Sequence, residues 1–216
     1  MFDSIKVLLV DDHVVVRAGY RRLLEQNSKI EVIAEAGSAE QGYQAFCEHQ
    51  PDVSVIDLSM PGMGGFELIR RILNREPSAA LLVFSMHEES LFARRALEAG
   101  ALGYITKNSA PDILVEAVQR VALKNIFLSL DVTHQFTLRD RAHKPNPLNA
   151  LSAKEFEVFR LLAEGRSIAE VAQALHLSHK TVANYQTQIK QKLGITNTTS
   201  LVHLAIQHGV IKVISG

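Results

Sequence analysis

The chain has 216 residues and is 47% hydrophobic, so it is long enough to bury one large core or two small ones, and a disordered chain is not expected. Lys plus Arg and Asp plus Glu each number 23, and this balance gives no indication of an acidic or nucleic-acid partner. The single cysteine, Cys47, excludes an intrachain disulfide, and no apolar run approaches the roughly 20 residues that span a bilayer. We therefore expect a soluble cytoplasmic protein with no membrane partner.

Short apolar runs rich in β-branched residues alternate with amphipathic stretches over residues 1–124, which carry a net charge of −4. The expected strands are Lys6–Val10, Glu31–Glu35, Val53–Ile56, Ala80–Phe84 and Gly103–Ile105. The expected helices are Val14–Gln26, Ala39–His49, Gly65–Arg75, Glu88–Ala99 and Ala110–Leu123. Strands that are apolar on both faces and separated by helices are typical of a parallel sheet covered on both sides. The pattern predicts a doubly wound α/β domain with a five-stranded parallel sheet.

The rest of the chain has a different pattern. Residues 125–147 are polar, contain Pro145 and Pro147, and show no sustained period, which predicts a linker. Residues 148–216 carry a net charge of +3 and show no strand-like alternation. Start signals that include two Ser and Glu capping boxes predict an all-α domain of four helices. These helices are expected to begin near Ser152, Ser167, Ser178 and Thr199.

Polar side chains follow four of the five expected strands. They are Asp11 and Asp12 after the first strand, Asp57 after the third, Ser85 after the fourth, and Thr106 and Lys107 after the fifth. Because the carboxyl ends of parallel strands meet at one edge of a sheet, we expect these groups to gather there. Three clustered carboxylates would raise one another's pKa, so they indicate a bound cation, and all-oxygen ligation favours Mg²⁺ over zinc.

The same groups fit an aspartate that is itself phosphorylated. Asp57 would attack the phosphoryl donor, while Mg²⁺ and Lys107 offset the charge on the transferred group and the Ser85 hydroxyl follows it. Taken singly, each residue is also typical of a turn, a helix cap or a solvated surface. His13 is interpreted as a helix-start residue rather than a metal ligand. A magnesium-dependent phosphohydrolase is the rival hypothesis, but it needs a second acid near the nucleophile, and none lies two residues after Asp57.

Four motifs in order, "VLLVDDH", "PDVSVIDLSMPGMGGFEL", "LLVFSMHEE" and "AGALGYITKNS", make the stretch Ile5–Leu123 resemble a receiver domain of two-component response regulators. The resemblance implies a flavodoxin-like sheet of strand order 2-1-3-4-5. It also implies that a sensor histidine kinase or a small phosphodonor phosphorylates Asp57. Its expected Mg²⁺ ligands are Asp11, Asp12, Asp57 and the backbone carbonyl of Ser59, and its switch residues are Ser85 and Tyr104.

One residue departs from the receiver pattern. Asn108 follows Lys107 at a position where many receivers have proline. A cis bond is then improbable on intrinsic grounds, which leaves the local geometry of Lys107 open.

The third helix of the C-terminal domain, "SHKTVANYQTQIKQKLG", has one apolar and one polar face. The apolar stripe consists of Val182, Tyr185, Ile189 and Leu193. The opposite face carries Lys180, Asn184, Thr187 and Gln191. A helix that follows another short helix in this way is typical of a helix-turn-helix, and Asn or Gln side chains read adenine edges. By composition alone a solvated face, or a helical domain that binds protein, is equally compatible, because a charge of +3 is modest.

Residues 148–210 resemble the LuxR-type helix-turn-helix of the NarL/FixJ regulators, as in "LSAKEFEVFRLLAEGRSIAEVAQALHLSHKTVANYQTQIKQKLGI". The resemblance implies binding to half-sites in double-stranded promoter DNA. The residues expected to contact DNA are Lys180, Thr181, Ala183, Asn184, Thr187, Lys190 and Gln191. In the family, lysine is common at the positions of Ala183 and Thr187, and it is missing here. We therefore expect fewer phosphate contacts and a DNA affinity that depends only weakly on salt concentration.

A receiver followed by this helical domain implies a transcriptional regulator controlled by phosphorylation. It would catalyse no reaction beyond its own phosphorylation and dephosphorylation, and it would form a homodimer when phosphorylated. Leu201, Val202 and Ala205 of the last helix either join two output domains or belong to the core, and the sequence leaves this open.

Overall fold

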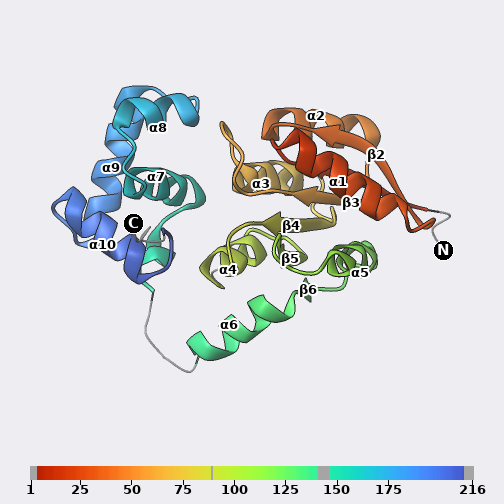
Figure 1. Cartoon of the computed structure of the whole chain (residues 1–216). Helices are drawn as coiled ribbons and strands as arrows, with labels where there is room; N and C mark the ends of the chain where they lie inside the picture. The colour runs from red at the N-terminus through yellow and green to blue at the C-terminus, as the bar shows by residue number, and fades with distance from the viewer. Residues whose placement is uncertain (1–3, 89, 141–145, 212–216) are drawn as a thin grey trace. The chain divides into compact units, whose positions relative to one another are not determined.

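The computed structural model describes residues 4–88, 90–140 and 146–211. The chain divides into two compact units, Met1–Arg141 and Ala142–Gly216 (Figure 1). Within the part of the chain that is described, no helix has both the length and the apolar character needed to cross a membrane.

The N-terminal unit is built on one parallel sheet. Its strands are β1 (Ile5–Val10), β2 (Ile30–Ala36), β3 (Val53–Ile56), β4 (Leu81–Ser85), β5 (Gly103–Thr106) and β6 (Phe127–Leu128). The strand order is β2-β1-β3-β4-β5-β6, and every pair is parallel. The predicted α/β fold and the order of the first five strands are confirmed. The predicted number of strands is wrong, because the sheet has six.

The sixth strand comes from the segment predicted to be a linker. Phe127 of β6 pairs with Gly103 of β5, and the helix α6 (Leu130–Asp140) follows directly. Phe127 packs against the apolar core, and Val132 of α6 is fully buried. A strand of two residues is too short to show alternation, and α6 has few apolar positions, so neither produces a clear sequence signal. The expectation of an irregular linker is therefore wrong for residues 127–140, and residues 141–145 lie outside the described part.

Helices cover both faces of the sheet. On one face, α1 (Val14–Glu25) and α5 (Pro111–Ala122) share one core cluster with inward residues of the strands, such as Val7 and Leu9. On the other face, Gly42 of α2 (Ala39–His49) lies against Val10 and against Leu68 of α3 (Gly65–Arg75). The helix α4 (Ser90–Glu98) contacts β5. Because both faces are covered, the polar groups that follow the strands are left at the carboxyl edge.

The C-terminal unit is helical, as predicted. A short 3₁₀ turn, η1 (Pro147–Ala150), precedes α7 (Ala153–Ala163), α8 (Ile168–Ala174), α9 (His179–Leu193) and α10 (Thr198–Gln207). Ser152 and Ser167 form the two predicted capping boxes, and Ser178 caps α9. Leu201 and Ala205 of α10 are fully buried and belong to the core, whereas Val202 is half-buried and its alternative stays open.

Glu155 in the first turn of α7 couples the stability of this unit to pH. Its carboxylate accepts hydrogen bonds from the Ser152 backbone N–H and from Lys192 Nζ, each at 2.7 Å. Burial raises the pKa of Glu155, but these hydrogen bonds outweigh burial and leave the pKa below its ordinary value. A group whose folded-state pKa is lowered stabilises the fold fully above its unfolded pKa of about 4.3, and this stability is lost as the pH falls through the folded-state value.

We expect Glu155→Gln to lower the free energy of unfolding at pH 7 by about 1–2 kcal/mol. We also expect the free energy of unfolding of this variant to fall less than that of the wild type as the pH is lowered. Urea unfolding of the C-terminal transition at several pH values measures both effects. Glu170→Gln removes the capping carboxylate of the other box, which bonds Ser167 on an exposed surface, and should have a smaller effect. An unchanged acid dependence in Glu155→Gln would contradict this account.

Candidate functional site

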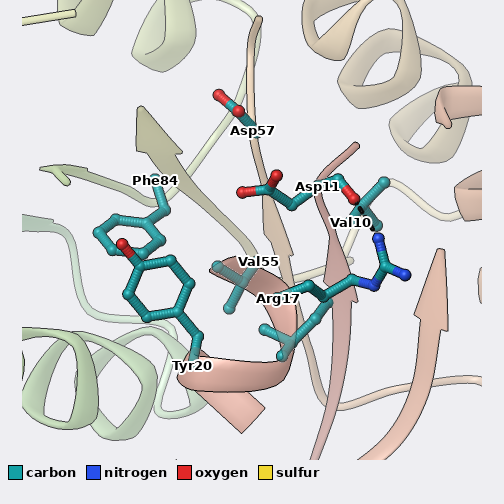
Figure 2. A pocket seen from close by; sticks show the side chains of 8 residues that line it. Val10, Asp11, Arg17, Tyr20, Val55, Asp57 and Phe84 are labelled. Carbon is teal, nitrogen blue, oxygen red and sulfur yellow. Dashed lines mark hydrogen bonds between the residues drawn. The ribbon is translucent and has the colours of Figure 1, made fainter. Parts of the chain in front are cut away.

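Two carboxylates meet because β1 and β3 are neighbours in the sheet. Val10 pairs with Ile56, so Asp11 and Asp57 follow adjacent strands, and the Asp57 backbone N–H donates to the Val10 carbonyl at 2.9 Å. The two side chains project to the same side of the sheet edge (Figure 2). Asp11 is 5% exposed and Asp57 is 2% exposed. Two nearly buried acids this close together require a positive partner.

Lys107 is that partner in this structure. Its Nζ lies 2.6 Å from Asp11 Oδ2 and 2.7 Å from Asp57 Oδ2. The lysine is brought there by β5, which pairs with β4, and by a hydrogen bond from its own backbone N–H to the Ser85 carbonyl. No peptide bond is cis among the described residues, so the expected trans bond before Asn108 is confirmed. The sequence prediction that these distant residues share one edge of the sheet agrees with this geometry.

Burial shifts the pKa values of both Asp57 and Lys107. It raises the pKa of Asp57, and the nearby Lys107 charge and the Ser59 backbone N–H offset this rise only in part. Burial alone would lower the pKa of Lys107, but the two carboxylates outweigh it and leave that pKa above its ordinary value. Lys107 therefore stays charged while it lies between the two carboxylates.

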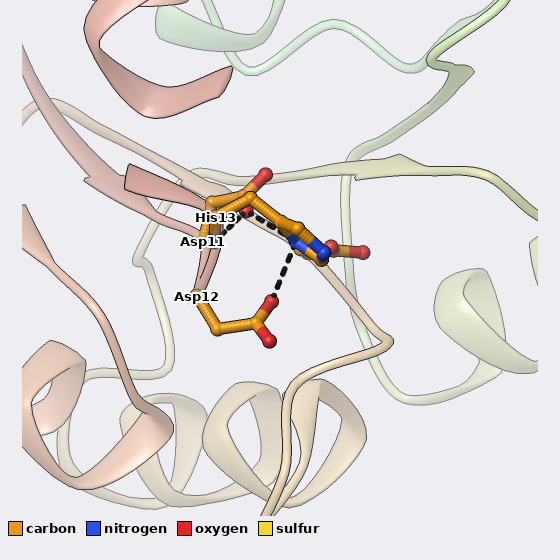
Figure 3. A group of neighbouring side chains, drawn as sticks. Asp11, Asp12 and His13 are labelled. Carbon is orange, nitrogen blue, oxygen red and sulfur yellow. Dashed lines mark hydrogen bonds and ion pairs between the residues drawn. The ribbon is translucent and has the colours of Figure 1, made fainter. Parts of the chain in front are cut away.

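Asp12 and His13 complete the acidic cluster (Figure 3). Asp12 Oδ1 is shielded from solvent and accepts no hydrogen bond within the described residues, while His13 Nδ1 lies 3.0 Å from it. One ligand atom from each of Asp11, Asp12, His13 and Asp57 lies within 4.8 Å of the others. This donor set, with an oxygen that lacks a hydrogen bond, fits a divalent cation. Ser59, the remaining expected ligand, is placed beside it by a 3.1 Å hydrogen bond from its N–H to Asp57 Oδ1.

Ser85 and Tyr104, the expected switch residues, are both fully buried. The Tyr104 hydroxyl donates to the His87 carbonyl at 2.6 Å, and Ser85 Oγ accepts a 3.3 Å hydrogen bond from the His87 N–H. The His87 ring in turn lies 3.2 Å from Ser59 Oγ and stacks on Phe92. His87 thus links the two switch residues to the loop that follows Asp57. A histidine two residues after a strand has no distinctive sequence signal, and our sequence reasoning missed it.

Two further residues at this edge were not expected. Arg17 of α1 donates from Nη1 to the Asp11 carbonyl at 2.5 Å and from Nε to Glu35 at 3.0 Å, which fixes the end of β1 (Figure 2). Asp131 of α6 accepts a 2.8 Å hydrogen bond from Thr106 Oγ1. Thr106, which the sequence placed at the same edge, therefore contacts α6.

Gly65 allows α3 to begin directly beside Asp57. A Cβ at this position would lie 2.3 Å from the Asp57 carbonyl oxygen and 2.7 Å from the Leu58 Cα, which are both backbone atoms. We expect Gly65→Ala to displace this loop, to lower the free energy of unfolding by about 1–3 kcal/mol and to slow phosphorylation. Urea unfolding and a phosphorylation time course check this. Gly19→Ala in α1 meets open space and should be neutral or stabilising. Equal effects of the two changes would contradict the steric argument.

The expected recognition helix is α9. Val182 and Ile189 are buried against the unit, and Tyr185 and Leu193 are half-buried, as the stripe predicted. The side chains expected to face DNA are accessible to different degrees. Lys180, Asn184, Thr187 and Gln191 are exposed, and Thr181, Ala183 and Lys190 are half-buried. Lys192, in the last turn of the same helix, donates a hydrogen bond to Glu155 within the unit.

The chain thus joins an α/β unit with an acidic edge to a separate helical unit. Residues 7–119 match the family model described as the response regulator receiver domain, and residues 149–205 match that of bacterial regulatory proteins of the luxR family. The chain belongs to the response regulators that join a receiver domain to a LuxR-type DNA-binding domain.

Similar proteins share this arrangement over most of their length. The transcriptional activator protein ExaE of Pseudomonas putida is 37% identical over 215 residues, which cover 96% of this chain and 98% of the relative. The response regulator UvrY of Escherichia coli K12 is 35% identical over 208 residues, 95% of each chain. RcsB of Salmonella enterica serovar Typhimurium, solved bound to a promoter with the phosphomimetic BeF₃⁻, is 28% identical with a TM-score of 0.70, covering 93% of this chain and 98% of that one.

Proposed function

We propose that Asp57 accepts a phosphoryl group from a sensor histidine kinase or a small phosphodonor, and that this modification controls binding of the C-terminal unit to promoter DNA. The observation that carries the proposal is the contact of Lys107 with both Asp11 and Asp57 at the carboxyl edge of the sheet. A buried, charged lysine held by two acids is a preformed stabiliser for an anion that arrives between them.

In the proposed reaction, an Asp57 carboxylate oxygen forms a bond to phosphorus while the bond to the donor breaks and the donor leaves with the electron pair. Lys107 would offset the charge on the transferred group, and the Ser59 N–H holds the Asp57 carboxylate in place. Asp11, Asp12, Asp57 and the Ser59 carbonyl would hold Mg²⁺, which supplies further positive charge to the phosphoryl oxygens. This reaction modifies the protein itself, in line with a regulator rather than an enzyme with a separate substrate.

The contacts around β4 and β5 support a route from Asp57 to the output unit. Ser85 and Tyr104 would move when the charge at Asp57 changes. Thr106 binds Asp131 at the start of α6, and the Ser90 N–H at the start of α4 donates to Gln135 of α6 at 3.1 Å. α6 is thus held by β5, which carries Tyr104, and by α4, which follows β4 and Ser85 in the chain; α6 also precedes the C-terminal unit in the sequence. A shift of β5 or of α4 would alter these contacts with α6, and through α6 the contacts or dimerisation of the output unit.

For the output unit, we propose that α9 enters the major groove of promoter half-sites, with a homodimer binding paired half-sites. The exposed amides of Asn184 and Gln191 would read adenine edges, and Lys180 at the start of the helix would contact phosphate. The promoter-bound RcsB structure, which spans nearly this whole chain, supports this reading. Action on promoter DNA would place the protein in the cytoplasm.

We expect Lys180→Ala to weaken DNA binding and to reduce the slope of log Kd against log salt by about 1, because one phosphate contact is lost. Fluorescence anisotropy at several salt concentrations measures the slope. Lys154→Ala, which removes a lysine paired with Glu157 in α7, is the matched control and should leave the slope unchanged. An unchanged slope in Lys180→Ala would remove this residue from the proposed interface.

A gel shift on genomic fragments, with and without a small phosphodonor, tests the proposal as a whole. We expect selected fragments to shift and the donor to change their affinity. Failure of every fragment to shift would favour a helical unit that binds protein. Rapid turnover of the phosphodonor into free phosphate would favour the phosphohydrolase.

A further inference from the structure

His13 occupies the position before α1, where a side chain often caps the helix. Its backbone is extended as an N-cap requires, but its side chain makes no capping hydrogen bond. The predicted helix-start position is confirmed, but the imidazole contacts carboxylates instead of capping the helix. Its Nδ1 lies 3.0 Å from Asp12 Oδ1 and 3.3 Å from Asp11 Oδ1, and the ring turns back toward the acidic cluster (Figure 3).

The backbone keeps this nitrogen near the carboxylates. The His13 N–H donates to Asp11 Oδ1 at 2.8 Å, so the residue that presents the ring is joined to the first acid of the cluster. His13 is also one of the four residues whose ligand atoms lie within 4.8 Å of one another. The ring itself is 62% exposed, so it has room to adjust when an ion enters.

An imidazole nitrogen changes which ion such a cluster prefers. Mg²⁺ takes oxygen ligands almost exclusively, whereas first-row transition ions such as Mn²⁺ accept imidazole as well as carboxylate. We propose that His13 supplies a nitrogen ligand to the cation held by Asp11, Asp12 and Asp57, so that the site binds Mn²⁺ more tightly than Mg²⁺. This inference rests on the metal site of the proposed function and extends it to the choice of ion.

The contacts of His13 also fit a simple ion pair with the two carboxylates, and the two roles predict different selectivity. If His13 acts only as a positive neighbour, its removal changes the affinity for every divalent ion by the same factor. If it is a ligand, its removal weakens Mn²⁺ relative to Mg²⁺. The ratio of the two dissociation constants therefore separates the roles.

The first experiment is calorimetric titration of the full chain with Mg²⁺ and with Mn²⁺. We expect His13→Ala to reduce the preference for Mn²⁺ over Mg²⁺ by about tenfold, since a direct ligand is lost. His134→Ala, which removes an exposed histidine of α6, is the control and should leave the preference unchanged. An equal change in both affinities, or no change, would overturn the inference.

The second experiment is pulsed electron paramagnetic resonance of the Mn²⁺ complex, which detects a nitrogen bound to the ion. We expect a ¹⁴N coupling in the wild type and in His134→Ala and its loss in His13→Ala. Absence of the coupling in the wild type would also overturn the inference. If the proposed metal site itself did not exist, the result would be different. Mg²⁺ and Mn²⁺ would then not compete for one site, and Asp57→Ala would not weaken the binding of either ion.

Discussion

Asp57→Asn should abolish the gain of one phosphoryl group that intact mass spectrometry records after treatment of the wild type with a small phosphodonor. Asp57 lies at the end of β3, beside Asp11, and its carboxylate shares with Asp11 the buried positive charge of Lys107. An amide oxygen is a far weaker nucleophile and does not form the acyl phosphate. The expected effect is complete loss of modification.

Asp52→Asn is a matched control, because Asp52 precedes the same strand that Asp57 follows. Its Oδ2 accepts a hydrogen bond from the Lys6 N–H at 2.8 Å, away from the carboxyl edge. This variant should gain the phosphoryl mass as the wild type does. Phosphorylation that persists in Asp57→Asn would mean that the acidic edge is not the acceptor site.

Lys107→Ala should slow phosphorylation by about 10²-fold or more, since it removes a preorganised charge from a site that excludes water. The lysine side chain is 6% exposed, so solvent ions replace it poorly. Without it, Asp11 and Asp57 would repel each other, and we expect added Mg²⁺ to stabilise the variant more than the wild type. A time course of intact mass and thermal unfolding with and without Mg²⁺ measure the two effects.

Lys124→Ala is the control for this prediction. Lys124 lies after α5, where it is exposed and hydrogen-bonds the Ser78 carbonyl, and its loss should not alter the phosphorylation rate. If Lys107→Ala were phosphorylated at the wild-type rate, the charge of Lys107 would have no part in the transfer.

Helices and strands whose apolar residues are regularly spaced could be predicted from the sequence. The bounds of β3, α2 and α3 agree with those expected, because uninterrupted apolar runs and amphipathic stretches determine them. β6 and α6 were missed, since their stability comes from pairing with β5 and from contacts such as Thr106 with Asp131 rather than from a local pattern. The burial of Leu201 likewise depends on packing within the C-terminal unit.

The residues of the acidic edge could be predicted because topology alone brings strand ends together. The sequence could not give the contacts of His87 with Ser59, of Arg17 with the Asp11 carbonyl, or of His13 with Asp12. Each of these depends on how a loop turns after its strand, and loop geometry leaves little trace in hydrophobic periodicity.

The most direct test of the central claim is the effect of the phosphodonor on DNA affinity in the wild type and in Asp57→Asn. Fluorescence anisotropy on a fragment selected by gel shift, at one fixed salt concentration, gives the four dissociation constants. The account predicts that the donor changes the wild-type Kd by a factor between about 5 and 150 and leaves that of Asp57→Asn unchanged. An equal change in both proteins, or none in either, would contradict it.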